Sequence, residues 1–199
     1  MKHCFSKMVI LGIIAAWQLS GGTIASDTNT TGTSALTGGY WGETFQTPAG
    51  GPWNTLTFNF FSDSAATTAE ATGILYLLNL EYLGTPSDLS SSTPGFIGST
   101  AASGGLWTFN PSLSVSAGTE YWVYVDTAQP TIYGGVAAVA NQGPYYTDSS
   151  ADPYFALTDT DVNFNFSGST GEREDTPEPT TLLLMAPALL LVLRRRLAR

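Results

Sequence analysis

The sequence predicts an all-β fold. We expect an antiparallel β-sandwich of about eight strands, jelly-roll-like, with an N-terminal signal helix before it and a short C-terminal transmembrane helix after it. Short apolar runs recur along the chain and no helical period persists between them. The runs are rich in aromatic and β-branched residues, which favour strands. Gly, Pro, Ser and Asp separate the runs, as is typical of sandwiches and barrels.

Residues 1–25 have the organisation of a secretory signal peptide. Lys2 and Lys7 form its basic region, and Met8–Trp17 is its apolar region. A sequence with small residues at the required positions ends at Ala25, which predicts cleavage between Ala25 and Ser26. An uncleaved anchor is the alternative, but an apolar region of about ten residues is too short to span a bilayer. We therefore expect secretion by the general secretory route.

The body of the protein lies between this signal and the C-terminal tail. Residues 26–39 are rich in Thr, Ser and Gly and predict a flexible leader, residues 40–168 form the sandwich domain, and residues 169–176 form a linker. Turn formers bound each apolar run of the domain. The expected strands are Tyr40–Thr47, Trp53–Phe61, Ala71–Leu83, Phe96–Ser99, Leu106–Asn110, Leu113–Ser116, Glu120–Asp126, Ile132–Ala140 and Tyr154–Phe166.

Two of these runs predict how the sheet is layered. In Glu120–Val125 both alternating sets of side chains are apolar, so we expect a central strand covered on both faces, with Trp122, Tyr124 and Val125 buried. In Asp159–Phe166 polar residues alternate with apolar ones, so one face of that strand is expected in solvent.

The chain ends in a polar motif, an apolar segment and a cationic stop. The motif is Pro177-Glu178-Pro179, the apolar segment is Leu182–Leu193, and the stop is Arg194, Arg195 and Arg196. A helix over the apolar segment is about 18 Å long, shorter than the hydrocarbon core of about 30 Å. A soluble C-terminal helix is the alternative, but the segment has no polar face. The positive-inside rule places the arginines in the cytoplasm and the body outside.

Residues 177–199 thereby resemble the PEP-CTERM sorting signal of Gram-negative bacterial surface proteins, which a membrane-embedded exosortase recognises and processes. The resemblance implies an exosortase-type protease or transpeptidase as a partner. It also implies a transient stay in the inner membrane, followed by delivery to the cell surface or the extracellular matrix.

The body carries a second resemblance. In order along the chain, it contains Tyr40-Trp41-Gly42-Glu43-Thr44-Phe45, Leu56-Thr57-Phe58, Leu113-Ser114-Val115-Ser116-Ala117-Gly118-Thr119-Glu120-Tyr121-Trp122-Val123 and Asp152-Pro153-Tyr154-Phe155-Ala156-Leu157. These segments are similar to the exported bacterial domains called choice-of-anchor domains, type R. The resemblance implies a domain that occurs with interchangeable C-terminal anchors, and it transfers no catalytic residue.

The composition excludes several function classes. The only histidine, His3, and the only cysteine, Cys4, lie in the predicted signal peptide, so the mature chain has no Ser-His-Asp or Cys-His nucleophile, disulfide framework, or imidazole or thiolate metal site. A product cut after Ala25 and near Pro179 has sixteen acidic residues and one basic residue, Arg173, which gives a formal net charge of −15. Such a charge repels nucleic acids, so we expect no nucleic-acid partner.

Acidic residues near the end of the body predict two kinds of calcium site. Asp159, Asp161 and Asn163 have the alternate spacing of a calcium loop, but Phe164 stands where that loop needs glycine, which favours a solvated polar face. A looser structural calcium site remains open. It would use the side chains of Asp148, Asp152 and Asp159. We expect no other cofactor.

Exposed aromatic side chains would provide platforms for sugar rings. Trp41, Tyr145 and Tyr146 are the candidates, with Tyr145-Tyr146 beside a Gly-Pro turn, although a core without disulfides needs most large aromatics. A pair of carboxylates would serve a glycan hydrolase without histidine. The nominal acids are Glu43, Glu70, Glu81 and Glu120.

Three functions follow from these patterns. We expect a non-enzymatic, exosortase-sorted protein of the cell surface or extracellular matrix. A carbohydrate-binding module for extracellular polysaccharide is the alternative, and a small glycan hydrolase is the third reading.

Overall fold

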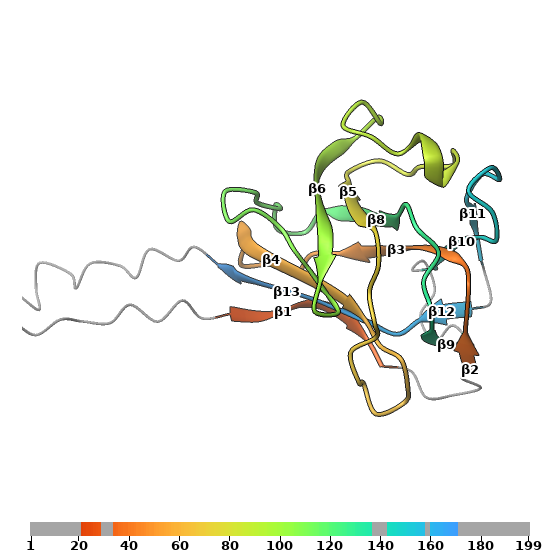
Figure 1. The fold of residues 1–199 in the computed structure, drawn as a ribbon. Coiled ribbons are helices and arrows are strands. Elements are labelled where there is room, and N and C mark those ends of the chain that lie inside the picture. Colours follow the sequence, from red (N-terminus) through yellow and green to blue (C-terminus); the bar gives the residue numbers. More distant parts are fainter. Residues whose placement is uncertain (1–20, 29–33, 137–142, 158–159, 171–199) are drawn as a thin grey trace, which may run out of the picture.

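The computed structural model describes residues 21–28, 34–136, 143–157 and 160–170 (Figure 1). Within these ranges the fold is all-β, as predicted, with one short 3-10 helix at Pro86–Asp88. The strands are β1 (Gly21–Asp27), β2 (Ser34–Leu36), β3 (Tyr40–Gln46), β4 (Trp53–Phe60), β5 (Ile74–Leu78), β6 (Phe96–Ser103), β7 (Leu106–Thr108), β8 (Glu120–Val125), β9 (Ile132–Val136), β10 (Tyr145–Thr147), β11 (Phe155–Ala156), β12 (Thr160–Val162) and β13 (Phe164–Thr170).

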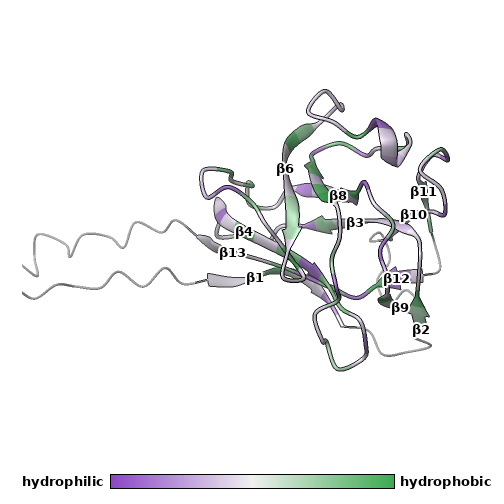
Figure 2. Ribbon diagram, in the orientation of Figure 1, coloured by the Kyte–Doolittle hydropathy of each residue, from purple (hydrophilic) through white to green (hydrophobic). Residues whose placement is uncertain are grey.

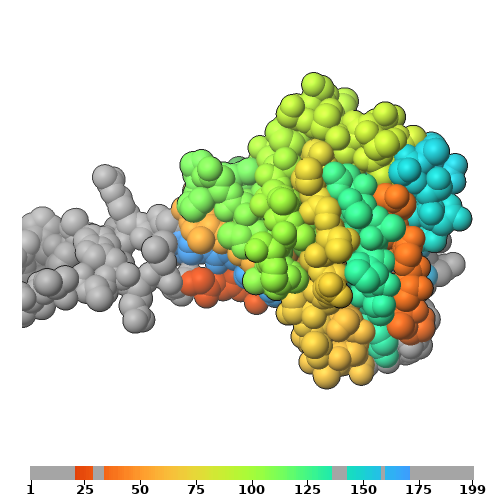
Figure 3. All heavy atoms as spheres, in the orientation of Figure 1, coloured from red at the N-terminus to blue at the C-terminus, as the bar shows by residue number. Residues whose placement is uncertain are grey.

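Ten of the strands form one antiparallel sheet in the order β1-β13-β4-β7-β6-β5-β8-β3-β10-β11. The sheet curls, so that β1, β13 and β4 pass behind β6 and β5 in the view of Figures 1 and 3. Strands β12, β9 and β2 form a second, small sheet. The architecture is therefore a curled sheet with a small second sheet. The strand order does not confirm the jelly-roll connections that the sequence predicts.

The main core fills the space between the two halves of the curled sheet. Phe58 on β4 lies edge-on to Phe60 and stacks on Phe164 of β13, with ring centroids 5.0 Å and 5.6 Å apart. Trp107 on β7 contacts both Phe58 and Phe60, and none of its surface is exposed. Hydrophobic residues also lie on β2, β3 and β8 (Figure 2). Aromatic packing therefore holds the domain together without disulfides.

A second aromatic cluster lies on the outer face of the β5-β8-β3-β10 region. Tyr124, Tyr145 and Tyr154 are among its buried residues, and residues 79–95 pass over it. The Tyr82 backbone N–H donates to the Tyr124 hydroxyl over 3.0 Å, which fastens this long connection to the sheet. Both faces of β8 are thus covered, as predicted, because a layer of loop replaces the second sheet.

Strand β8 is central, as predicted, and lies between β5 and β3. Tyr124 and Val125 are fully buried. Trp122 is only half-buried, because it lies at the rim of the outer cluster, where its Nε1 donates to the Tyr145 hydroxyl over 3.2 Å. The expectation of a buried Trp122 is therefore wrong.

The predicted strand boundaries differ from the structure in several regions. The run Ala71–Leu83, for example, shortens to β5 at Ile74–Leu78. Residues Leu113–Ser116 form no strand and contribute a single bridge between Val115 and Trp53. The run Tyr154–Phe166 divides into β11, β12 and β13, because its parts pair with three different strands. Strands β1 and β2 lie in the stretch that the sequence assigned to the end of the signal peptide and the leader.

No described helix has the length and hydrophobicity that a membrane crossing requires. The predicted signal helix, the sorting motif, the transmembrane segment and the arginine stop lie outside the described residues. The first and last described strands, β1 and β13, pair antiparallel, with Gly21 opposite Ser169. The described chain therefore begins and ends at one end of the molecule (Figures 1 and 3).

Candidate functional site

The chemically most unusual place in the described structure is a buried carboxyl pair. Glu43 lies in the middle of β3, with β8 on one side and β10 on the other, and its surface is 0% exposed. Its Oε1 accepts a hydrogen bond from the Thr44 backbone N–H over 2.8 Å. Its Oε2 has no hydrogen-bond partner within the described residues. A charged carboxylate held in this way would be strongly destabilising.

Asp161 is the second member of the pair. It lies on β12 of the small sheet, its surface is 2% exposed, and its Oδ1 has no hydrogen-bond partner within the described residues. The expectation that Asp161 lies on a solvent-exposed strand face is therefore wrong. Asn163 on the same face is 1% exposed, because the small sheet turns that face toward the interior of the molecule.

Burial raises the pKa of both carboxyls. Burial is the main cause that raises the pKa of Glu43 well above its usual value, and the nearby Asp161 adds to it, while the Thr44 N–H opposes it. Burial also raises the pKa of Asp161 to about 7, with a further contribution from Asp27. The described residues include no Lys, Arg or His that would neutralise the pair. A bound proton therefore neutralises the carboxyl charge, which a cationic side chain would otherwise do.

The burial of Glu43 and Asp161 limits the chemistry that this carboxyl pair can perform. A general acid or base must reach the substrate within hydrogen-bonding distance, and Glu43 has no exposed surface for such a contact. Glu70, Glu81 and Glu120 are exposed, and they lie before β5, after β5 and at the start of β8. The pair is thus suited to proton binding and to setting the stability of the fold.

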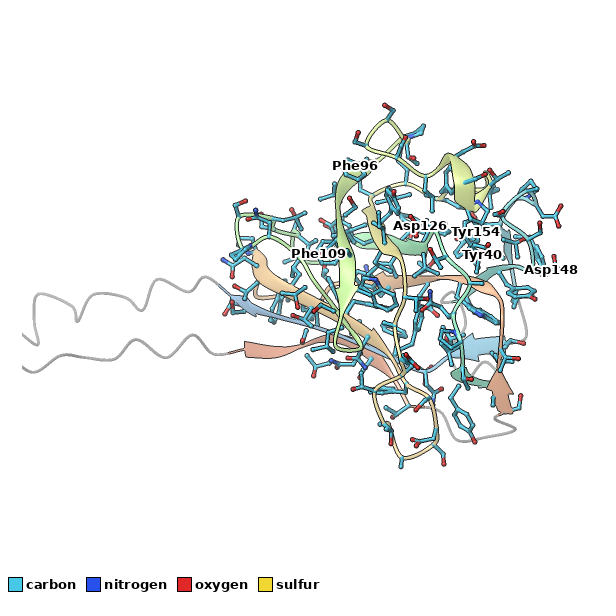
Figure 4. The ribbon with its side chains drawn as sticks, viewed as in Figure 1. Tyr40, Phe96, Phe109, Asp126, Asp148 and Tyr154 are labelled. Atoms are coloured by element: carbon cyan, nitrogen blue, oxygen red, sulfur yellow. The ribbon has the colours of Figure 1, made fainter. Side chains whose placement is uncertain are left out.

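The outer aromatic cluster carries a short polar network. The Trp122 Nε1 donates to the Tyr145 hydroxyl over 3.2 Å, and this hydroxyl donates to Glu81 Oε1 over 2.8 Å. Tyr154 donates its hydroxyl proton to the Val125 carbonyl of β8. Figure 4 shows Tyr40 and Tyr154 close together in this region. The network joins the 79–95 connection to β10 and β8.

We predict that Tyr145→Phe lowers the free energy of unfolding by about 1 kcal/mol, because it removes the hydroxyl that links Trp122 and Glu81. The matched control is Tyr146→Phe, on the opposite face of the same strand. Chemical denaturation with urea measures both. Equal effects of the two variants would show that the hydroxyl network does not stabilise the loop.

The three predicted sugar-binding residues do not share one exposed face. Trp41 is 4% exposed and Tyr145 is 7% exposed, and both belong to the packed interior. Tyr146 is half-buried and its ring lies 4.6 Å from that of Trp41. Adjacent strand residues point to opposite faces, so Tyr145 and Tyr146 are separated by the sheet. Sequence reasoning missed Phe155, which is 50% exposed and lies against Tyr146.

The residues of the predicted calcium site are only partly described. Asp148 and Asp152 are exposed, and Asp148 lies at the periphery of the molecule (Figure 4). Asp159 lies outside the described residues. The described acidic residues form no group of three that would hold a metal ion. A structural calcium site at these positions stays a prediction.

Among known proteins, no family model, no curated protein and no solved structure matches this chain.

Proposed function

We propose that this protein is exported and sorted to the cell surface or extracellular matrix of a Gram-negative bacterium, where its body has a non-enzymatic role. One observation carries the proposal. The chain ends in Pro177-Glu178-Pro179, an apolar segment too short for a comfortable permanent span, and an arginine stop. This order suits recognition and release by an exosortase-type membrane enzyme, with the arginines in the cytoplasm.

The position of the chain ends supports this proposal. Gly21 and Ser169 are paired, so the segments before β1 and after β13 both leave from one end of the body. Six residues separate Thr170 from Pro177, and seven fully extended Cα-to-Cα steps reach about 25 Å. A membrane enzyme that acts at the motif therefore works close to this end, which faces the bilayer while the rest of the body points away.

The burial of the carboxyl pair supports the non-enzymatic part of the proposal. A glycan hydrolase needs two carboxyl groups that flank a sugar bond in an open cleft. Glu43 and Asp161 lie near each other but are enclosed, so no substrate reaches them in this conformation.

Replacing the sorting motif tests the proposal. We expect the change of Pro177, Glu178 and Pro179 to alanine to leave export intact and to block processing, so that the full tail stays on the membrane-bound protein. Cell fractionation and electrophoretic mobility measure both outcomes. The matched control is the change of Glu172, Glu174 and Asp175 to alanine, which alters as many residues in the preceding linker. Unchanged mobility and surface delivery of the motif variant would refute the sorting function.

A carbohydrate-binding role is the second candidate, and one observation favours it. Phe155 is 50% exposed beside Tyr146, and a flat exposed aromatic ring suits stacking on a sugar. The partner would be the extracellular polysaccharide. If this role holds, the exported protein binds a neutral glycan on an array and Phe155→Ala loses at least about tenfold in affinity, on the order of 1.4 kcal/mol. Leu83→Ala, which changes a side chain that is 55% exposed, is the control and keeps full affinity.

A further inference from the structure

Strand β1 contributes a core side chain from the segment just before the predicted cleavage site. Ile24 is 5% exposed and belongs to the main hydrophobic core. It lies at an irregularity in the β1–β13 pairing, between Thr23, which pairs with Ser167, and Ala25, which pairs with Phe166. The irregularity turns the isoleucine inward, so that this short edge strand covers part of the core.

Strand β13 is shaped to receive this side chain. At Gly168, an added Cβ would lie 2.8 Å from Ile24 Cδ1 and 2.9 Å from both the Asn54 carbonyl oxygen and Leu56 Cδ2. Real Cβ atoms essentially never approach other heavy atoms so closely, and the Asn54 carbonyl oxygen belongs to the backbone, so the site requires glycine. The end of the Ile24 side chain packs into the space that the missing Cβ leaves. A segment that is discarded before folding would have no need of such a fit. The fit therefore indicates that Ile24 belongs to the mature domain.

Cleavage between Ala25 and Ser26 would dismantle this arrangement. It would remove Gly21–Ala25, and of the β1–β13 ladder only the pairs of Ser26 with Asn165 and Asp27 with Phe164 would remain. The core would lose a buried isoleucine, and much of β13 would become an unprotected sheet edge. A domain without disulfides has little stability to spare for such a loss.

We propose that signal peptidase cuts between Gly22 and Thr23, and that the mature chain starts at Thr23. This inference rests on the proposed export. The sequence Ser20-Gly21-Gly22 has small residues at both positions that the enzyme reads, as Thr23-Ile24-Ala25 does. The earlier cut lies nearer the end of the apolar region at Trp17. It leaves Thr23–Asp27 in place and removes from β1 only Gly21 and Gly22, neither of which belongs to the core.

The test uses the full chain, expressed in a Gram-negative host and recovered after export. N-terminal sequencing of the wild-type protein is expected to start at Thr23. The variant Ile24→Asn changes a residue that the mature protein keeps only if the cut precedes it. We therefore expect the exported variant to differ in mass from the wild type by this one substitution and to melt at least roughly 5 °C lower. Thr23→Ser, an exposed and small change on the same strand, is the control and should leave the melting temperature unchanged.

Each outcome separates this inference from the proposed export. An N-terminus at Ser26, with the Ile24→Asn product identical in mass and melting temperature to the wild type, would overturn the proposed cut and leave export intact. A chain that still starts at Met1 and stays in the cytoplasm would overturn both. If the asparagine variant fails to accumulate, the wild-type N-terminus alone decides: Thr23 supports the inference and any other residue refutes it.

Discussion

Replacing Trp107 with alanine should lower the free energy of unfolding by about 3 to 5 kcal/mol. Trp107 has no exposed surface and lies against the rings of Phe58 and Phe60, and its Nε1 donates to the Gly73 carbonyl over 3.3 Å. Truncation leaves a cavity between the two halves of the curled sheet. It also removes one of the two hydrogen bonds that the Gly73 carbonyl accepts, while the bond from the Ala102 backbone N–H remains. The loss is a large part of the total stability of a domain of this size.

Equilibrium unfolding in urea, followed by tryptophan fluorescence, measures this effect. Phe155→Ala is the matched control, because it truncates a large aromatic side chain that is 50% exposed, and it should cost less than about 1 kcal/mol. Similar costs for both variants would mean that β7 does not close the core in the way described.

The second large effect concerns pH. We expect the protein to be more stable near pH 5 than near pH 8, because burial raises the pKa of both Glu43 and Asp161. Between the usual carboxyl range near pH 4 and the Asp161 pKa of about 7, the folded protein holds a proton that the unfolded chain has released. The free energy of unfolding therefore falls as the pH rises through this window.

Asp161→Asn should remove the part of this pH dependence that Asp161 contributes, while burial still raises the pKa of Glu43. It replaces the acid with a neutral group of similar size, so the fold no longer contains two carboxyls that compete for ionisation. At pH 8 the variant should be more stable than the wild type by on the order of 1 to 3 kcal/mol, the range for relieving an unsatisfied buried group. Asp148→Asn, at an exposed acid, is the control. Parallel curves of melting temperature against pH for Asp161→Asn and the wild type would contradict the role of the pair.

The sequence was sufficient to predict the fold class and the central strand. Both alternating sets of Glu120–Val125 are apolar, and β8 is covered on both faces. Trp122 differs from the expectation because a loop, and not a second sheet, covers its side of the strand. The periodicity of a strand indicates that a face is covered, but it does not indicate how far the cover extends.

The buried carboxyl pair was not predictable from the sequence pattern. Asp161 and Asn163 alternate with apolar residues, which is the usual pattern of a half-exposed strand. Their burial depends on the small β12-β9-β2 sheet, whose strands come from distant parts of the chain. Glu43 gave only a weak signal, an acid within an otherwise apolar and aromatic run. Three-dimensional placement alone brings Glu43 and Asp161 together.

The position of Ile24 in the hydrophobic core could not be predicted from the sequence, for a different reason. The sequence around it satisfies two patterns at once, the small residues of a cleavage site and the apolar residue of an edge strand. The fit between Ile24 and Gly168 becomes visible only when β1 and β13 are paired. Local patterns cannot choose between two uses of the same residues when the deciding partner lies far along the chain.

The central claim is that the tail carries the body to the membrane and is then separated from it. Two epitope tags test it directly, one after Arg199 and one in the exposed stretch at Ser91-Ser92, between the 3-10 helix and β6. In a native host with an exosortase, the body tag should appear at the cell surface or in the medium, and the C-terminal tag should stay with the inner membrane. In a host that lacks the exosortase, both tags should stay together on the membrane. Both tags on one surface-exposed or cytoplasmic chain in the native host would contradict the account.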